Sequence, residues 1–160
     1  MDDKIQRGED WLEQLLELAE IPATAKRSSS QTMDDGSCWL EIDASQLSPE
    51  QIQILVGDRG TVLDSIQYLI NTTLNLGRPD TEQQPYTVEL DGYRVRRQAE
   101  LQAIADMAAK QVMETGEDYE ISELSSAERR QVHNLLKDYE SLQTESRGQE
   151  PDRRLVVRRI

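Results

Sequence analysis

The sequence predicts an α+β protein built from two small modules. Runs with helical spacing of apolar residues alternate with short stretches in which apolar and polar residues alternate, and a pair of glycines interrupts one helical pattern. The 160 residues, 36% hydrophobic and 31% charged, suit one ordinary domain or two small ones with thin cores. We place the boundary between the modules after residue 92, which gives residues 1–92 and 93–160.

The first module is predicted to begin with a helix and two strands. Residues 9–20 have apolar side chains at helical spacing, and Pro22 follows them. Residues 23–29 are typical of a polar edge strand, and residues 38–42 alternate as a half-buried strand does. The turn residues Asp35-Gly36 between the two strands indicate a hairpin.

Two helices and a strand are predicted to complete this module. Ser48 can cap a helix that has Pro49 at its first position, and Gln51 can close the capping box. After the glycines, apolar residues keep helical spacing from residue 62 to about residue 76. Residues 86–90 are typical of a strand, so the predicted order is α-β-β-α-GxxG-α-β.

The second module has a different predicted order. Residues 93–115 indicate one long helix, and residues 119–124 a strand. A capping box at Ser125 begins a helix that runs to about residue 139. Strands are predicted at residues 141–146 and 153–160, which makes this a small α/β module behind a linking helix.

The two glycines of the first module, Gly57 and Gly60, are separated only by Asp58 and Arg59. A Gly-x-x-Gly turn permits positive φ and close approach of the backbone to a ligand, and the following helix presents N–H groups that favour anions. This layout resembles a type II KH domain, whose GxxG loop clamps the backbone of a single strand. The resemblance implies that all four residues contact RNA. The alternative is a tight turn between helices that binds nothing.

The loop departs from the usual KH pattern because Asp58 is acidic. A carboxylate beside a phosphate path is repulsive by roughly 1 kcal/mol at a screened surface, and Arg59 offsets this repulsion. We expect weak binding, with the bases lying against apolar side chains beside the loop. Ile54, Val56 and Val62 are the candidates for that groove, with core packing as their alternative role.

The helix of the second module carries the only histidine of the chain, His133. Arg129 lies four residues earlier, so the two share a helix face; Lys137 extends this face by one turn and Arg130 borders it. The opposite side carries the packing residues Val132, Leu135 and Leu136. The alternatives are a structural histidine and a basic face that is merely solvated.

An Arg-x-x-x-His helix is similar to that of the R-three-H domain, a small module that binds single-stranded nucleic acid. Four stretches in this order resemble the bacterial Jag family (SpoIIIJ-associated RNA-binding proteins) over roughly residues 38–160: GDRGTVLDSIQYLIN (57–71), LDGYRVRRQAELQAIADMAAK (90–110), SSAERRQVHNLLKD (125–138) and ESRGQEPDRRLVVRRI (145–160). The resemblance implies a non-enzymatic protein that binds single-stranded RNA, with single-stranded DNA as the alternative.

The last strand supplies further candidate phosphate contacts. Arg154 and Arg158 share a face because alternate strand residues do, and Arg153 joins them from the start of the strand. Tyrosines are candidate stacking platforms or core residues; these are Tyr93, Tyr119 and Tyr139.

The charge of −13 argues against simple electrostatic binding of nucleic acid, but its distribution is uneven. Residues 1–90 carry six basic and 17 acidic side chains, whereas residues 91–160 carry 12 and 14, so the net charges are −11 and −2. The acidic module favours an alternative function, that of an adaptor that binds a protein partner and has weak or lost RNA binding.

Other classes of function find little support. We predict no catalytic residue, because no nucleophile elbow, P-loop or zinc signature is present, and no cofactor or metal, because one histidine and one cysteine make no His/Cys cluster. The single Cys38 fits a reducing compartment. No long apolar run is present, so we expect no membrane insertion, no signal peptide and a cytosolic location.

Overall fold

A computed structural model describes residues 2–28 and 36–160 of the chain. It divides into two compact units, residues 1–95 and 96–160. The division falls within the first turn of the long helix, three residues after the boundary that the sequence suggested. Helices and short sheets occur in both units, which confirms the α+β class.

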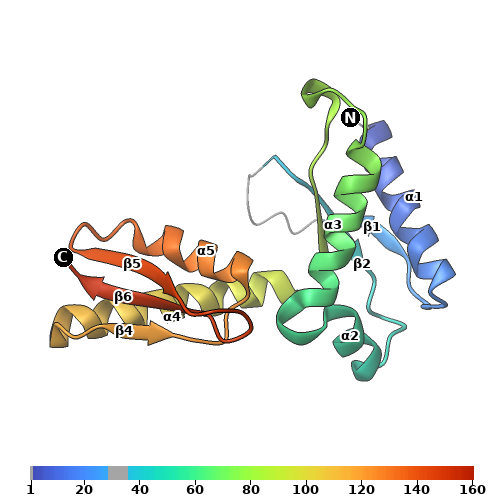
Figure 1. Ribbon diagram of the computed structural model, residues 1–160. Helices are drawn as coiled ribbons and strands as arrows, with labels where there is room; N and C mark the ends of the chain where they lie inside the picture. Colours follow the sequence, from blue (N-terminus) through green and yellow to red (C-terminus); the bar gives the residue numbers. More distant parts are fainter. Residues whose placement is uncertain (1, 29–35) are drawn as a thin grey trace. The chain divides into compact units, whose positions relative to one another are not determined.

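The first unit contains a three-stranded sheet of strands β1 (Ala25–Arg27), β2 (Cys38–Ile42) and β3 (Tyr86–Leu90) (Figure 1). The strand order is β1-β2-β3, with β1 antiparallel to β2 and β2 parallel to β3. The predicted pairing of the first two strands is therefore confirmed, while Asp35 of the predicted turn lies outside the described residues.

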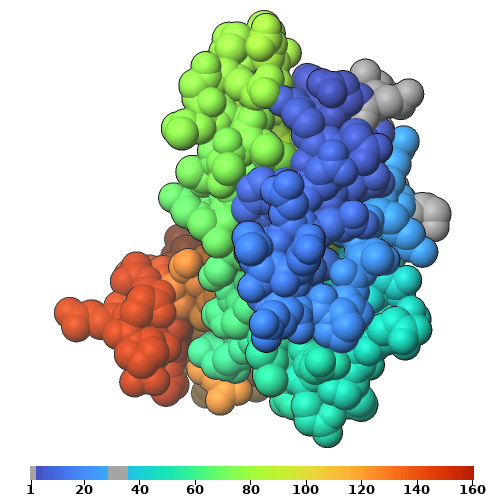
Figure 2. Space-filling model, turned by 90° about the vertical axis from the view of Figure 1, so that its right-hand side faces the viewer, coloured from blue at the N-terminus to red at the C-terminus, as the bar shows by residue number. Residues whose placement is uncertain are grey.

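Helices α1 (Asp2–Leu18) and α3 (Thr61–Asn75) lie side by side over this sheet (Figure 2), and α2 (Pro49–Val56) precedes α3. Single turns of 3-10 helix, η1 (Asp58–Gly60) and η2 (Asp80–Glu82), lie before and after α3. The apolar faces of the helices and of the sheet share one core, formed mainly by Leu12, Leu16, Leu40, Ile42, Leu63, Ile70, Val88 and Leu90.

Helix α1 begins seven residues earlier than the sequence indicated. Its first turns are mostly polar, so no apolar stripe marks them, but tertiary contacts hold them. The Tyr86 hydroxyl donates to the Lys4 carbonyl at 2.6 Å. A Cβ on Gly8 would lie 2.5 Å from the ring of Tyr86, so glycine is what lets the helix approach so closely.

The second unit is built from α4 (Tyr93–Thr115), β4 (Tyr119–Ile121), α5 (Ser126–Leu136), β5 (Leu142–Arg147) and β6 (Arg154–Arg159). Helix α4 begins in the first unit and continues into the second. The three strands form an antiparallel sheet in the order β4-β6-β5. The strands and helices follow the predicted order, although β4 and α5 end three residues earlier than predicted.

The core of the second unit lies between one face of the sheet and the two helices. Leu155 and Val157 of β6 point into it, which places Arg154 and Arg158 on the opposite face because side chains alternate along a strand. The helices supply Leu101, Ala105, Ala108, Val112, Val132 and Leu136. Within the described part of the chain, no helix has both the length and the apolar character that crossing a membrane requires.

Candidate nucleic-acid interface

The loop between α2 and α3 needs glycine at both predicted positions. Gly57 and Gly60 have φ values of 76° and 77°, in the left-handed region that favours glycine. A Cβ on Gly57 would lie 2.5 Å from Val62 Cγ2, and one on Gly60 would lie 2.7 Å from Tyr93 Cε1. Conformation and space therefore exclude larger side chains at both sites.

The two residues between the glycines present opposite charges. The side chain of Asp58 is 84% exposed and that of Arg59 is 35% exposed. Their nearest charged atoms are 3.7 Å apart, beyond ordinary hydrogen-bond length, so this ion pair is weak. Arg59 itself has a φ of 53°, which holds its backbone in the left-handed region between the glycines.

The start of α3 lacks the side-chain cap that two other helices have. Ser48 and Gln51 form the predicted capping box on α2, and the Ser125 hydroxyl accepts from the Glu128 amide on α5. Helix α3 begins at Thr61, and its N-cap residue Gly60 forms no side-chain hydrogen bond to the first turn. Uncapped amides at a helix N-terminus favour an anion.

Apolar side chains lie exposed on the helices that flank the loop. Ile54 on α2 is 70% exposed and Val62 on α3 is 39% exposed, whereas Val56 packs against the core. Of the three candidates for a base groove, only Val56 therefore takes the core role. Tyr68 on α3 is also exposed, although no motif in the sequence marks it.

The tyrosines predicted as stacking platforms are poorly placed for that role. Tyr93 is half-buried against the first core, and Tyr119 and Tyr139 against the second. The Tyr139 hydroxyl also donates to Asp106. Packing accounts for all three side chains.

Arg129 does not lie on a solvated basic face, which corrects the geometry that helical spacing suggested. The residue is only 6% exposed. Its Nη1 donates to the Leu124 carbonyl at 2.9 Å and to the Arg153 carbonyl at 3.5 Å, and its Nη2 pairs with the Glu150 carboxylate. The guanidinium is therefore anchored between the segment before α5 and the turn between β5 and β6.

His133 follows Arg129 along the same side of α5, as predicted, and faces strand β5. Its Nδ1 is hydrogen-bonded to the Thr144 hydroxyl, and the ring is half-buried. Arg153 lies in the turn just before β6, and its side chain reaches β5: its Nε donates to the Ser146 hydroxyl and its Nη1 to the Gly148 carbonyl, each at 2.8 Å. These polar side chains form a rim between α5 and β5, here called the α5–β5 rim: Arg129, His133, Thr144, Ser146 and Arg153.

Arg130 on α5 and Lys137 at its C-terminal cap are the predicted basic residues here that remain open to solvent. Both are exposed, and neither forms a salt bridge with any described residue. They lie seven residues, or about two helical turns, apart and therefore share a side of the helix. Their charges are available to a ligand without disturbing the core.

Arg154 and Arg158 lie on the outer face of the sheet, but carboxylates already pair with them. Arg154 bonds Glu120 at 2.9 Å, and Arg158 approaches Asp118 at 3.2 Å and Glu145 at 3.7 Å. The shared face follows the predicted alternation. The paired acids make this face a much weaker phosphate path than the arginines alone suggested.

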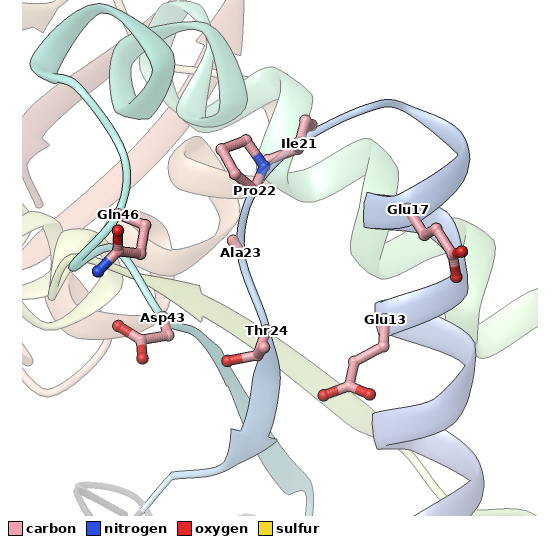
Figure 3. A pocket seen from close by; sticks show the side chains of 8 residues that line it. All are labelled: Glu13, Glu17, Ile21, Pro22, Ala23, Thr24, Asp43 and Gln46. Atoms are coloured by element: carbon pink, nitrogen blue, oxygen red, sulfur yellow. The ribbon is translucent and has the colours of Figure 1, made fainter.

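An open pocket lies on the acidic unit, between α1 and the segment after β2 (Figure 3). Its volume is about 420 Å³. The carboxylates of Glu13, Glu17 and Asp43 surround it, and the lining also includes Ile21, Pro22, Ala23, Thr24 and Gln46. A hydrogen bond from the Ser45 amide lowers the pKa of Asp43, and Glu13 accepts from the Ala25 amide, so two of these acids also hold local backbone.

Comparison with known proteins agrees with the geometry of the second unit. Residues 99–159 match the R-three-H domain. This match confirms the R-three-H assignment and covers α5 together with all three strands of the unit. The KH interpretation of the first unit stays a prediction.

Several bacterial proteins with the name RNA-binding protein KhpB are similar to this chain. The protein of Clostridium symbiosum is 31% identical over 111 residues, covering 69% of this chain and 49% of the relative. That of Bacillus subtilis is 30% identical over 113 residues, covering 69% and 53%. The chain thus spans about half the length of these relatives. Their names describe RNA-binding proteins, in agreement with the prediction of a non-enzymatic protein.

Proposed function

We propose that this chain is a non-enzymatic, cytosolic protein that binds single-stranded RNA through both of its units. The observation that carries the proposal is the R-three-H match over residues 99–159, joined to relatives that are named RNA-binding proteins. The glycine loop of the first unit adds a second contact point. Two weak modules on one chain gain affinity because binding of the first raises the effective concentration of the second.

In the first unit, the RNA backbone would lie along Gly57 and Gly60, which is the arrangement of a KH domain. The absence of a side chain at either position permits close approach, and the uncapped first turn of α3 favours a phosphate. Arg59 supplies positive charge and Asp58 limits it, so this contact is weak. Ile54 and Val62 offer apolar surface to the bases.

In the second unit, Arg130 and Lys137 would make the first electrostatic contacts because both are exposed and unpaired in the described residues. Arg129, His133 and Arg153 would follow from the α5–β5 rim, where hydroxyl groups also lie. Arg154 and Arg158 contribute less because their carboxylate partners must first be displaced.

The direct test is fluorescence anisotropy with a short labelled single-stranded RNA, the same sequence as DNA, and a duplex, at low and moderate salt. Arg59→Asp tests the first unit, and the double variant Arg130→Glu with Lys137→Glu tests the second. Lys26→Glu and Lys110→Glu are matched controls, since each reverses an exposed charge away from the proposed contacts.

We expect single strands to bind, with weaker affinity in both test variants and near-native affinity in both controls. If each control lost as much affinity as Arg59→Asp, and the double variant lost more in proportion to its larger change in charge, only net charge would matter. No binding at low salt by a folded protein would refute the proposal.

The second candidate function is that of an adaptor that binds a basic protein segment through the acidic first unit. The pocket among Glu13, Glu17 and Asp43 favours it, because apolar residues at Ile21 and Pro22 lie within reach of those carboxylates. RNA binding that is lost in both test variants would rule out an adaptor that has no RNA function.

A further inference from the structure

We infer that the Glu150 carboxylate occupies the position on Arg129 that an RNA phosphate takes, so that Glu150 competes with RNA at the R-three-H helix. This inference rests on the proposed function and names the regulation of that same site. The ligand is a phosphodiester group, and the competitor is a side chain of the chain itself.

The direction of the Arg129 hydrogen bonds defines the site. Nη1 points inward and donates to the carbonyls of Leu124 and Arg153. Nη2 pairs with Glu150, whose side chain is 57% exposed while that of Arg129 is 7% exposed. A ligand that approaches from solvent therefore meets this guanidinium where the Glu150 carboxylate now lies.

An RNA phosphate can take the place of the Glu150 carboxylate, because Arg129 binds both anions in the same way. A guanidinium recognises carboxylate and phosphate oxygens through the same charge-assisted hydrogen bonds. Arg153 adds a second cation at this point of the rim, anchored by Ser146 and Gly148. In the described residues, Glu150 is the carboxylate that forms a salt bridge with Arg129, so its departure leaves that buried cation uncompensated.

Glu150 is also held loosely enough to be displaced. It belongs to the exposed turn between β5 and β6, and its side chain makes no hydrogen bond in the described structure other than that to Arg129. A partly exposed ion pair of this kind contributes up to about 1 kcal/mol. Displacing it therefore weakens RNA binding about fivefold and does not block it.

The test compares the full chain with Glu150→Gln and with the matched control Asp152→Asn. Asp152 lies in the same turn, is exposed and forms no salt bridge with any described residue, so its substitution removes the same charge without freeing Arg129. One readout is the affinity for a short labelled single-stranded RNA by anisotropy. The other is the Arg129 Nε–Hε signal in NMR during titration with inorganic phosphate.

We expect Glu150→Gln to bind RNA about fivefold more tightly than the native chain and to shift the Arg129 signal at lower phosphate. Asp152→Asn should differ little from the native chain. Equal behaviour of the two variants in both readouts would overturn the inference, and weaker binding by Glu150→Gln would show that Glu150 positions Arg129 instead. A gain in the phosphate titration without RNA binding by any protein would support the competition and refute the proposed function.

Discussion

Truncation of Arg129 should destabilise the second unit as well as remove a ligand contact. Arg129→Ala leaves the carbonyl of buried Leu124 without its donor, which costs about 1–3 kcal/mol. Loss of the pair with Glu150 adds less than about 1 kcal/mol, because that carboxylate is largely exposed. We therefore expect the free energy of unfolding of this unit to fall by about 2–3 kcal/mol.

The two tryptophans allow this loss to be assigned to one unit. Trp11 and Trp39 both lie in residues 1–95, so tryptophan fluorescence follows the first unit, whereas far-ultraviolet circular dichroism follows both. In Arg129→Ala, the fluorescence transition should stay where it is. A circular-dichroism transition should move down by roughly 8–24 °C, because 1 kcal/mol shifts the midpoint of a unit of 60–100 residues by about 4–8 °C.

Arg130→Ala is the matched control, since the neighbouring side chain is exposed and should change stability by less than about 0.5 kcal/mol. If Arg129→Ala unfolds at the native temperature by both probes, the hydrogen bonds to the Leu124 and Arg153 carbonyls contribute nothing. Arg129 would then act on RNA alone and would not anchor the second unit.

Three further substitutions or reactions test the packing of the first unit. Gly8→Ala should lower the urea midpoint followed by tryptophan fluorescence, because overpacking against the Tyr86 ring costs about 1–3 kcal/mol. This cost exceeds the gain in helix propensity from alanine, so a higher midpoint would contradict the prediction. Gly60→Ala should also lower this midpoint, because the substitution costs about 1–3 kcal/mol of unfolding free energy: a Cβ there would lie 2.7 Å from Tyr93, and φ is positive. An unchanged midpoint would show that the loop adapts. Burial raises the pKa of the Cys38 thiol, so alkylation by iodoacetamide at neutral pH should be slower in the folded chain than in urea; equal rates would refute it.

Where local sequence signals agreed with tertiary packing, the elements were predictable to the residue. Strands 38–42 and 86–90 and the helix 93–115 have their predicted bounds, because alternation, helical spacing and glycine mark their ends. The first turns of α1 carry no such signal. Their stability comes from Tyr86, more than 70 residues later in the chain, which contacts Lys4 and Gly8.

The candidate site was predictable in its residues but not in which of them face solvent. Helical spacing placed Arg129 and His133 on one side of α5, as observed. Arg129 is anchored by the Arg153 carbonyl and paired with Glu150, and no local pattern connects either residue to it. One signal was present: Arg129, Val132 and Leu136 are spaced by three and four residues, so the arginine continues the apolar stripe that packs on the sheet.

The pairing of the outer-face arginines predicts how salt will affect binding. Each phosphate contact to a single strand contributes about −0.7 to the slope of log K against log salt, so Arg59, Arg130, Lys137 and Arg153 together give about −3. Arg129 adds little to the slope, because a phosphate there only replaces the Glu150 carboxylate. Free contacts from Arg154 and Arg158 as well would give about −4. We expect a slope near −3, because Glu120, Asp118 and Glu145 already neutralise Arg154 and Arg158 within the chain. A slope near −4 that falls in Arg154→Gln would mean that RNA displaces these carboxylates and that the outer sheet face belongs to the interface.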